Sequence, residues 1–139
     1  MTDTLTRRAG RFAAVVLAAD SVCHLYWLTG ATWPFPDERA LSLAVLGLQA
    51  PFTAPVLIPL AVLLAVAAGA LWRRLRLAAI VVAVAAAVQV PVRIAWAFGV
   101  GGRDAGPLFP WLNVMIYLPA CALLALAAYR VARNGRTRS

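Results

Sequence analysis

Hydrophobic residues along the chain gather in four long runs, and polar residues gather between them. The runs cover approximately residues 12–30, 50–72, 77–100 and 109–131. Each has about the 20 residues that a helix needs to cross the hydrocarbon core of a bilayer. Because the backbone in lipid must satisfy its hydrogen bonds within the segment, each run predicts an α-helix. The pattern predicts an all-α fold, an integral membrane four-helix bundle that forms one domain over residues 1–139.

The connection between the first two runs is too long and too apolar for a simple turn. Pro36, Asp37 and Glu38 form a helix start, with acids that suit the positive end of a helix dipole. We expect a short apolar helix on the membrane surface, either as a lid over the bundle or as an interfacial spacer.

Composition favours the membrane over water. The chain is 63% hydrophobic and only 13% charged, which is more apolar surface than a soluble domain of this length can bury. A net charge of +8 would indicate nucleic acid if it lay on one soluble face. The charges lie between the apolar runs instead, so we expect membrane lipid and no nucleic acid as a partner.

The arginines predict the orientation. They gather before the first run, between the second and third, and after the fourth, whereas the other two connections hold one arginine each beside an acid. The arginines at these three places are Arg7, Arg8, Arg11, Arg73, Arg74, Arg76, Arg130, Arg133, Arg136 and Arg138. The other two connections hold Arg39 and Arg103. By the positive-inside rule both termini are expected to be cytoplasmic, in a multi-pass protein of the cell inner membrane. Asp20 and His24 interrupt the first run, which disfavours a cleaved signal peptide.

Polar and aromatic side chains recur at helical spacing on one face of three runs. They are Asp20, His24 and Trp27 in the first run, Gln89, Arg93 and Trp96 in the third, and Asn113 and Tyr117 in the fourth. At a rise of about 1.5 Å per residue, the polar members lie roughly 6 to 15 Å below the outer ends of their helices. They share a layer, so we expect one polar pocket that opens toward the outer leaflet.

The energetics of charge in lipid strengthen this prediction. An unpaired charge at the bilayer centre costs at least about 2.5 to 3.5 kcal/mol on insertion scales. Asp20 and Arg93 are therefore expected to neutralise one another across the bundle. Pro91 and Pro119 lie beside these polar positions, and each removes a backbone hydrogen bond, either to shape the pocket or to kink the helix for packing.

This set of residues suits a membrane-embedded enzyme that acts on a lipophilic small molecule by acid/base chemistry without a cofactor. The expected catalytic residues are Asp20, His24, Arg93 and Tyr117, and the expected substrate-binding residues are Trp27, Gln89, Trp96 and Asn113. Asp20 would be the general acid or base and His24 its relay. Terpenoid-like cyclisation, epoxide opening and double-bond isomerisation fit this chemistry, by analogy with small helical cyclases and isomerases. A single histidine without a ligand set predicts no metal and no haem.

Two other classes stay open. An Asp, His and Arg set inside a membrane also suits a proton-coupled carrier or a binding protein for a small amphiphile, and a homo-oligomer would supply the chain length that transport needs. The polar residues would alternatively lock the bundle of a structural assembly protein by hydrogen bonds between helices.

Two short motifs carry a resemblance. His24 to Gly30 read His-Leu-Tyr-Trp-Leu-Thr-Gly, and Tyr117 to Cys121 read Tyr-Leu-Pro-Ala-Cys. Together with Arg93 late in the third run, they resemble a bacterial family of small four-span membrane proteins described only as a domain of unknown function. The resemblance covers nearly the whole chain and implies the four-span fold. Asn113 and Ala97 stand where the resemblance implies acids, which would leave Asp20 as the sole carboxylate inside the membrane.

Overall fold

The computed structural model describes residues 2–100 and 108–134, and four long apolar helices dominate this part of the chain. They are α1 (Thr2–Leu28), α3 (Ala54–Trp72), α4 (Arg76–Ala97) and a fourth continuous helix, Leu108–Asn134. The fourth consists of α5 (Leu108–Leu112), the π-helical segment η1 (Asn113–Tyr117) and α6 (Leu118–Asn134). All four are long and apolar enough to cross a membrane. The predicted all-α architecture is confirmed; Arg103, Arg136 and Arg138 lie outside the described residues.

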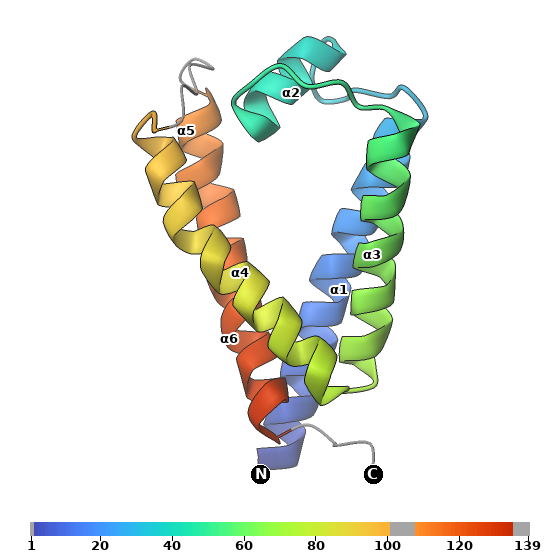
Figure 1. The fold of residues 1–139 in the computed structure, drawn as a ribbon, viewed down its shortest axis with the longest axis vertical. Helices are drawn as coiled ribbons and strands as arrows, with labels where there is room; N and C mark the ends of the chain where they lie inside the picture. The colour runs from blue at the N-terminus through green and yellow to red at the C-terminus, as the bar shows by residue number, and fades with distance from the viewer. Residues whose placement is uncertain (1, 101–107, 135–139) are drawn as a thin grey trace.

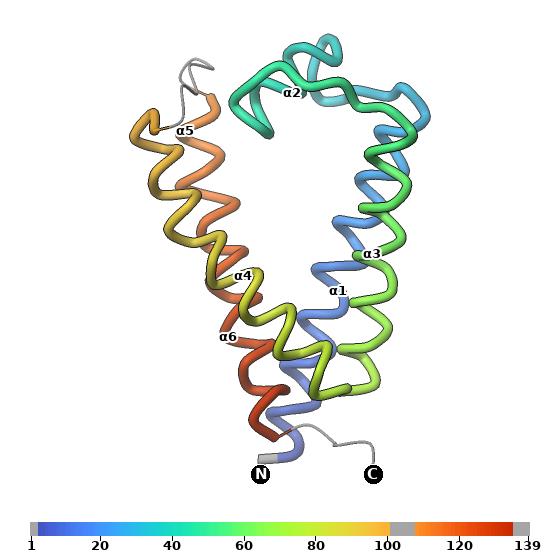
Figure 2. The backbone as a smooth tube through the Cα atoms, viewed as in Figure 1, coloured from blue at the N-terminus to red at the C-terminus, as the bar shows by residue number. Residues whose placement is uncertain are grey.

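The helices are arranged as two pairs that diverge from one end. Helix α1 packs against α3 to form one arm, and α4 packs against α6 to form the other (Figure 1). The arms meet where α1 contacts α6, and they separate toward the opposite end, as the tube in Figure 2 shows. We call the joined end, which carries Arg7, Arg74 and Arg130, the arginine-rich end, and the other the α2 end.

Small residues bring the arms together at the arginine-rich end. The buried core there draws on all four long helices and consists of Ala13, Ala14, Leu17, Ala68, Leu71, Ala79, Ala127, Val131 and Ala132. At Gly10, a Cβ atom would stand 2.9 Å from the carbonyl oxygen of Leu71. Such close backbone approach is how helices associate in lipid, where no hydrophobic force acts between them.

Most of the apolar surface points outward. Only 17 to 22% of the most apolar window of each long helix is buried inside the molecule. Exposed side chains such as Leu63, Val66, Val81 and Leu126 would be unfavourable in water. This distribution fits a multi-pass membrane protein, in which lipid covers the outward faces.

The predicted surface helix is present as α2 (Glu38–Leu46). Asp37 caps it, because its Oδ1 accepts a hydrogen bond from the backbone N–H of Ala40 at 2.7 Å. The helix ends at Gly47, whose φ of 70° lies in the left-handed region. In Figure 1, α2 lies across the wide end of the molecule, between the two arms.

Helix α2 contacts both arms. On one side, Glu38 Oε1 accepts a hydrogen bond from the backbone N–H of Phe52 at 2.7 Å, just before α3 begins. On the other side, α2 packs on α5, where the ring of the fully buried Phe109 lies against Gly47. A Cβ atom at Gly47 would stand 2.6 Å from that ring, so only glycine fits there.

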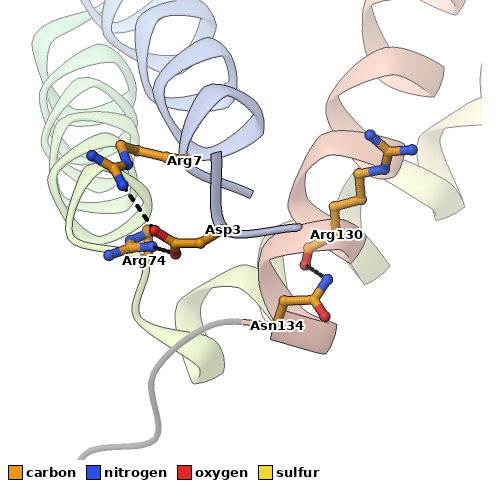
Figure 3. A network of polar contacts seen from close by, with 5 residues as sticks. All are labelled: Asp3, Arg7, Arg74, Arg130 and Asn134. Carbon is orange, nitrogen blue, oxygen red and sulfur yellow. Dashed lines mark hydrogen bonds and ion pairs between the residues drawn. The ribbon is translucent and has the colours of Figure 1, made fainter. Parts of the chain in front are cut away.

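Ion pairs organise the arginine-rich end. Asp3 in the first turn of α1 accepts a hydrogen bond from Arg7 at 2.8 Å and pairs with Arg74 in the turn between α3 and α4 (Figure 3). Arg74 has a φ of 59°, which is the left-handed conformation that ends a helix. The pair therefore ties the start of α1 to the only tight turn between two long helices in the described chain.

Candidate functional site

Helix α1 contributes Asp20 and His24, one turn apart on the same face. His24 Nδ1 lies 2.7 Å from the backbone oxygen of Asp20 and 3.5 Å from its carboxylate Oδ1. A backbone carbonyl only accepts hydrogen bonds, so we assign the ring proton to Nδ1, which leaves Nε2 as the acceptor of a neutral imidazole. The Asp20 side chain is 52% exposed and that of His24 only 13%. The carboxylate is thus the accessible member of the pair.

A chain of ring contacts leads from His24 toward α2. His24 and Trp27 meet edge to face, with ring centroids 5.3 Å apart, and Trp27 meets Phe52 in the same way at 5.5 Å. Phe52 in turn donates its backbone N–H to Glu38. The position of Asp20 and His24 is therefore coupled by direct contacts to the anchoring of α2.

The other arm holds Arg93 in a nest of aromatic and amide groups. Arg93 Nη1 donates a hydrogen bond to Asn113 Oδ1 at 3.1 Å. Its guanidinium carbon lies 4.8 Å from the Tyr117 ring centroid and 5.1 Å from that of Trp96. Cation–π contacts of a desolvated guanidinium are worth about 2 kcal/mol. These groups stabilise the Arg93 charge without a carboxylate.

Two buried nitrogen atoms in this nest have no acceptor among the described residues. They are Arg93 Nε and Asn113 Nδ2. Because a guanidinium only donates, Asn113 must turn its oxygen toward Arg93, and its NH₂ group therefore points elsewhere. Asn113 is fully buried, so in this structure it holds Arg93 and has no open face of its own.

The π-helical segment places Asn113 and Tyr117 beside Arg93. The backbone N–H of Leu118 bonds to the carbonyl of Asn113, five residues earlier, instead of four. Pro119 follows directly; it lacks an N–H, and its ring would clash with a carbonyl four residues before it in a regular α-helix. A π turn relieves this conflict, and such turns recur at functional sites. The sequence predicted a break near Pro119 but not its type.

The two groups come from different arms, Asp20 and His24 from α1 and Arg93, Asn113 and Tyr117 from α4 and η1. Asp20 lies within electrostatic range of Arg93, and Tyr117 within range of Asp20 and Cys23. The predicted ion pair is not formed, however: no bridge joins Asp20 to Arg93 in residues 2–100 and 108–134. The reason is geometric, because the arms diverge toward the α2 end. We call Asp20, His24, Arg93, Asn113 and Tyr117 together the inter-arm site.

Some residues fall outside the predicted arrangement. Gln89 was expected in the polar layer, but it is exposed and makes no hydrogen bond within the described residues. Cys121, one turn beyond Tyr117, interacts with Arg93, and its helical spacing already places it on the face of Asn113 and Tyr117. Ser21 was also missed: it is buried and donates a hydrogen bond to the carbonyl of Ala61 in α3 at 2.8 Å. The signal for Ser21 was a small polar residue in line with Gly10, Ala14 and Leu17.

Comparisons with known proteins add no further restraint on function. No family model matches the chain, and neither a curated protein nor a solved structure is detectably similar to it.

Proposed function

We propose that this protein is a membrane-embedded enzyme of the isomerase or cyclase type, which moves a proton on a lipophilic small molecule held at the inter-arm site. The observation that carries the proposal is the accessible carboxyl group of Asp20, backed by His24 and opposed by the Arg93 nest across the arms. A charged group inside a membrane span is expensive and marks function by default.

The chemistry follows from the roles that the contacts allow. Protonated Asp20 gives its proton to an alkene carbon or an epoxide oxygen of the substrate. For an alkene, the π electron pair forms the new C–H bond and leaves a cation on the neighbouring carbon. The Asp20 carboxylate then removes a proton from an adjacent carbon, and that C–H pair closes the product double bond. The step is redox-neutral and needs no cofactor.

The remaining groups orient the substrate and the acid. His24 holds Asp20 through Nδ1 and offers Nε2 as a proton relay. Arg93 Nε lacks an acceptor, which a substrate oxygen would supply after a small movement of the nest. Asn113 is then a positioning residue that acts through Arg93.

In the proposed orientation, the arginine-rich end and both termini face the cytoplasm, and the inter-arm site lies in the outer half of a bacterial inner membrane. The support is the distribution of Arg7, Arg74 and Arg130 at one end, against Asp37 and Glu38 at the other.

A second function is favoured by the divergence of the arms. A proton-coupled carrier or a binding protein would use the same Asp20 and His24 pair, and arms that join at one end and separate at the other can alternate between conformations. A carrier or binding protein would release the amphiphile without changing it chemically.

The experiment separates chemistry from transport. The protein is reconstituted in vesicles in D₂O with oxidosqualene or geranylgeraniol as probe, and mass spectrometry measures deuterium incorporation and product formation. We expect turnover in the wild type, and loss of at least about 100-fold in Asp20→Asn, the usual contribution of a general acid. The matched control is Asp37→Asn, since asparagine caps a helix as well as aspartate does. Uptake of unchanged probe that requires Asp20 would favour the carrier instead.

A further inference from the structure

A groove at the arginine-rich end lies between α1 and α6, away from the inter-arm site. It encloses about 840 Å³ and is open along one side. Leu5, Phe12 and Leu126 line it, together with Arg130 and Arg133. Phe12 lies eight residues before Asp20 on α1, which separates the groove from Asp20 by about 12 Å along the helix.

The groove changes in polarity along its length. Helices α1 and α6 run in opposite directions, so Phe12 and Leu126 lie toward the middle of the membrane spans, whereas Leu5, Arg130 and Arg133 lie toward the arginine-rich end. Leu5, Phe12 and Leu126 are between 43 and 63% exposed, so the apolar part is not filled by the protein itself. One end of the groove suits a hydrocarbon chain and the other an anion.

The charge at the polar end is unbalanced. Arg130 and Arg133 both line the groove, and no acidic residue among residues 2–100 and 108–134 does. Asp3 is the acid described at this end, and Arg7 and Arg74 already engage it (Figure 3). Arg133 also lies over the Tyr129 ring, with 5.9 Å to the centroid, which holds its guanidinium beside the groove. Arginine forms paired hydrogen bonds with phosphate oxygens.

We infer that this groove binds one anionic phospholipid from the leaflet at the arginine-rich end, with its phosphate on Arg130 and Arg133 and one acyl chain along Phe12 and Leu126. The order of polar and apolar lining matches the way in which a phospholipid enters a bilayer, and basic pockets between membrane helices bind such head groups. The inference is independent of the chemistry proposed for the inter-arm site.

The test measures lipid binding to the full-length protein in detergent by native mass spectrometry. Phosphatidylglycerol and phosphatidylcholine with identical acyl chains are the two probes. We expect retention of phosphatidylglycerol over phosphatidylcholine, and about a 25-fold weaker affinity for phosphatidylglycerol in R130Q/R133Q, at about fivefold per arginine.

Matched variants separate a site from general surface charge. R11Q/R73Q removes the same charge at the same end from residues that do not line the groove, and it should keep the wild-type affinity. Leu126→Trp fills the groove without a change in charge and should weaken binding, whereas Val88→Trp, on an exposed face of α4, should not. Equal losses in the two arginine pairs, equal binding of the two lipids, or a second copy of the chain in place of lipid would overturn the inference.

Discussion

Asn113 holds Arg93 through a hydrogen bond of 3.1 Å from a position with no solvent exposure, at the first residue of the π-helical segment. This hydrogen bond, and not an ion pair with Asp20, holds the guanidinium group of Arg93 in place. It joins the two helices of one arm at the level of the inter-arm site. Its loss should therefore lower both the stability and the activity of the protein.

Replacing Asn113 with Leu should destabilise the protein by about 1 to 3 kcal/mol, because a buried charged donor loses its acceptor. Asn113→Asp should retain the contact and keep most of the stability. The measurement is the thermal unfolding midpoint in detergent. Gln89→Leu is the control, since it removes the same amide from an exposed site without a hydrogen bond within the described chain. An equal loss in both leucine variants would contradict this role of Asn113.

Gly47→Ala should loosen α2 from α5. The added methyl group would stand 2.6 Å from the Phe109 ring, and alanine also disfavours the φ of 70°. We expect the substitution to destabilise the packing of α2 on α5 by about 1 to 3 kcal/mol. The measurement is hydrogen exchange, which should become faster in α2. Phe109→Leu should recover part of this cost when combined with Gly47→Ala.

Gly69→Ala provides the matched control for Gly47. Gly69 lies inside α3, and nothing stands within 4 Å of the Cβ that alanine would add there. Alanine should stabilise this helix by about 0.5 to 1 kcal/mol. If Gly47→Ala behaved like Gly69→Ala, the close contact between α2 and α5 would not exist in the membrane.

Ser21→Ala should cost about 0.6 kcal/mol, the average for a hydrogen bond between helices in lipid. Ser21→Val should cost more, because a branched side chain must also fit between α1 and α3, where Ser21 is only 5% exposed and Ala61 only 1%. Thr4→Ala, at an exposed position of α1, is the control in the same unfolding assay. A Ser21→Val variant as stable as wild type would show that the helices do not pack closely there.

Asp3→Asn should lower the unfolding midpoint at low salt, since it removes the partner of both Arg7 and Arg74. The difference from wild type should shrink at about 1 M salt, where the Debye length falls to about 3 Å. Asp37→Asn serves as the control. A salt-independent difference would point to a packing effect of Asp3 instead.

The sequence was sufficient for the four helices, because bilayer-length apolar runs are local signals. It was only partly right on the polar layer, since Gln89 is exposed and no ion pair joins Asp20 to Arg93 in the described chain. It placed Arg93, Asn113 and Tyr117 together correctly. It failed on the partner of Asp20, because depth along each helix does not give the distance between two helices. The divergence of the arms depends on where small residues such as Gly10 and Ser21 allow close packing, which is a property of pairs of helices and not of any one run.

Helix ends were a second limit of the sequence. The first span was expected to begin near Phe12, yet α1 continues back to Thr2, because Asp3 and Arg7 form an ion pair one turn apart that supports a polar helix outside the apolar run. Hydropathy alone cannot report such a continuation.

The π-helical segment amounts to one extra residue in an otherwise α-helical path. Removing one residue between Asn113 and Tyr117 would rotate everything before it by about 100° relative to α6. Phe109 would then lose its contact with Gly47, and Asn113 would lose its hydrogen bond with Arg93. A single-residue deletion would therefore break the contact between α2 and α5 and the contact between η1 and α4 together. The length of this short stretch thus sets the rotation of α5 relative to α6, on which both contacts depend.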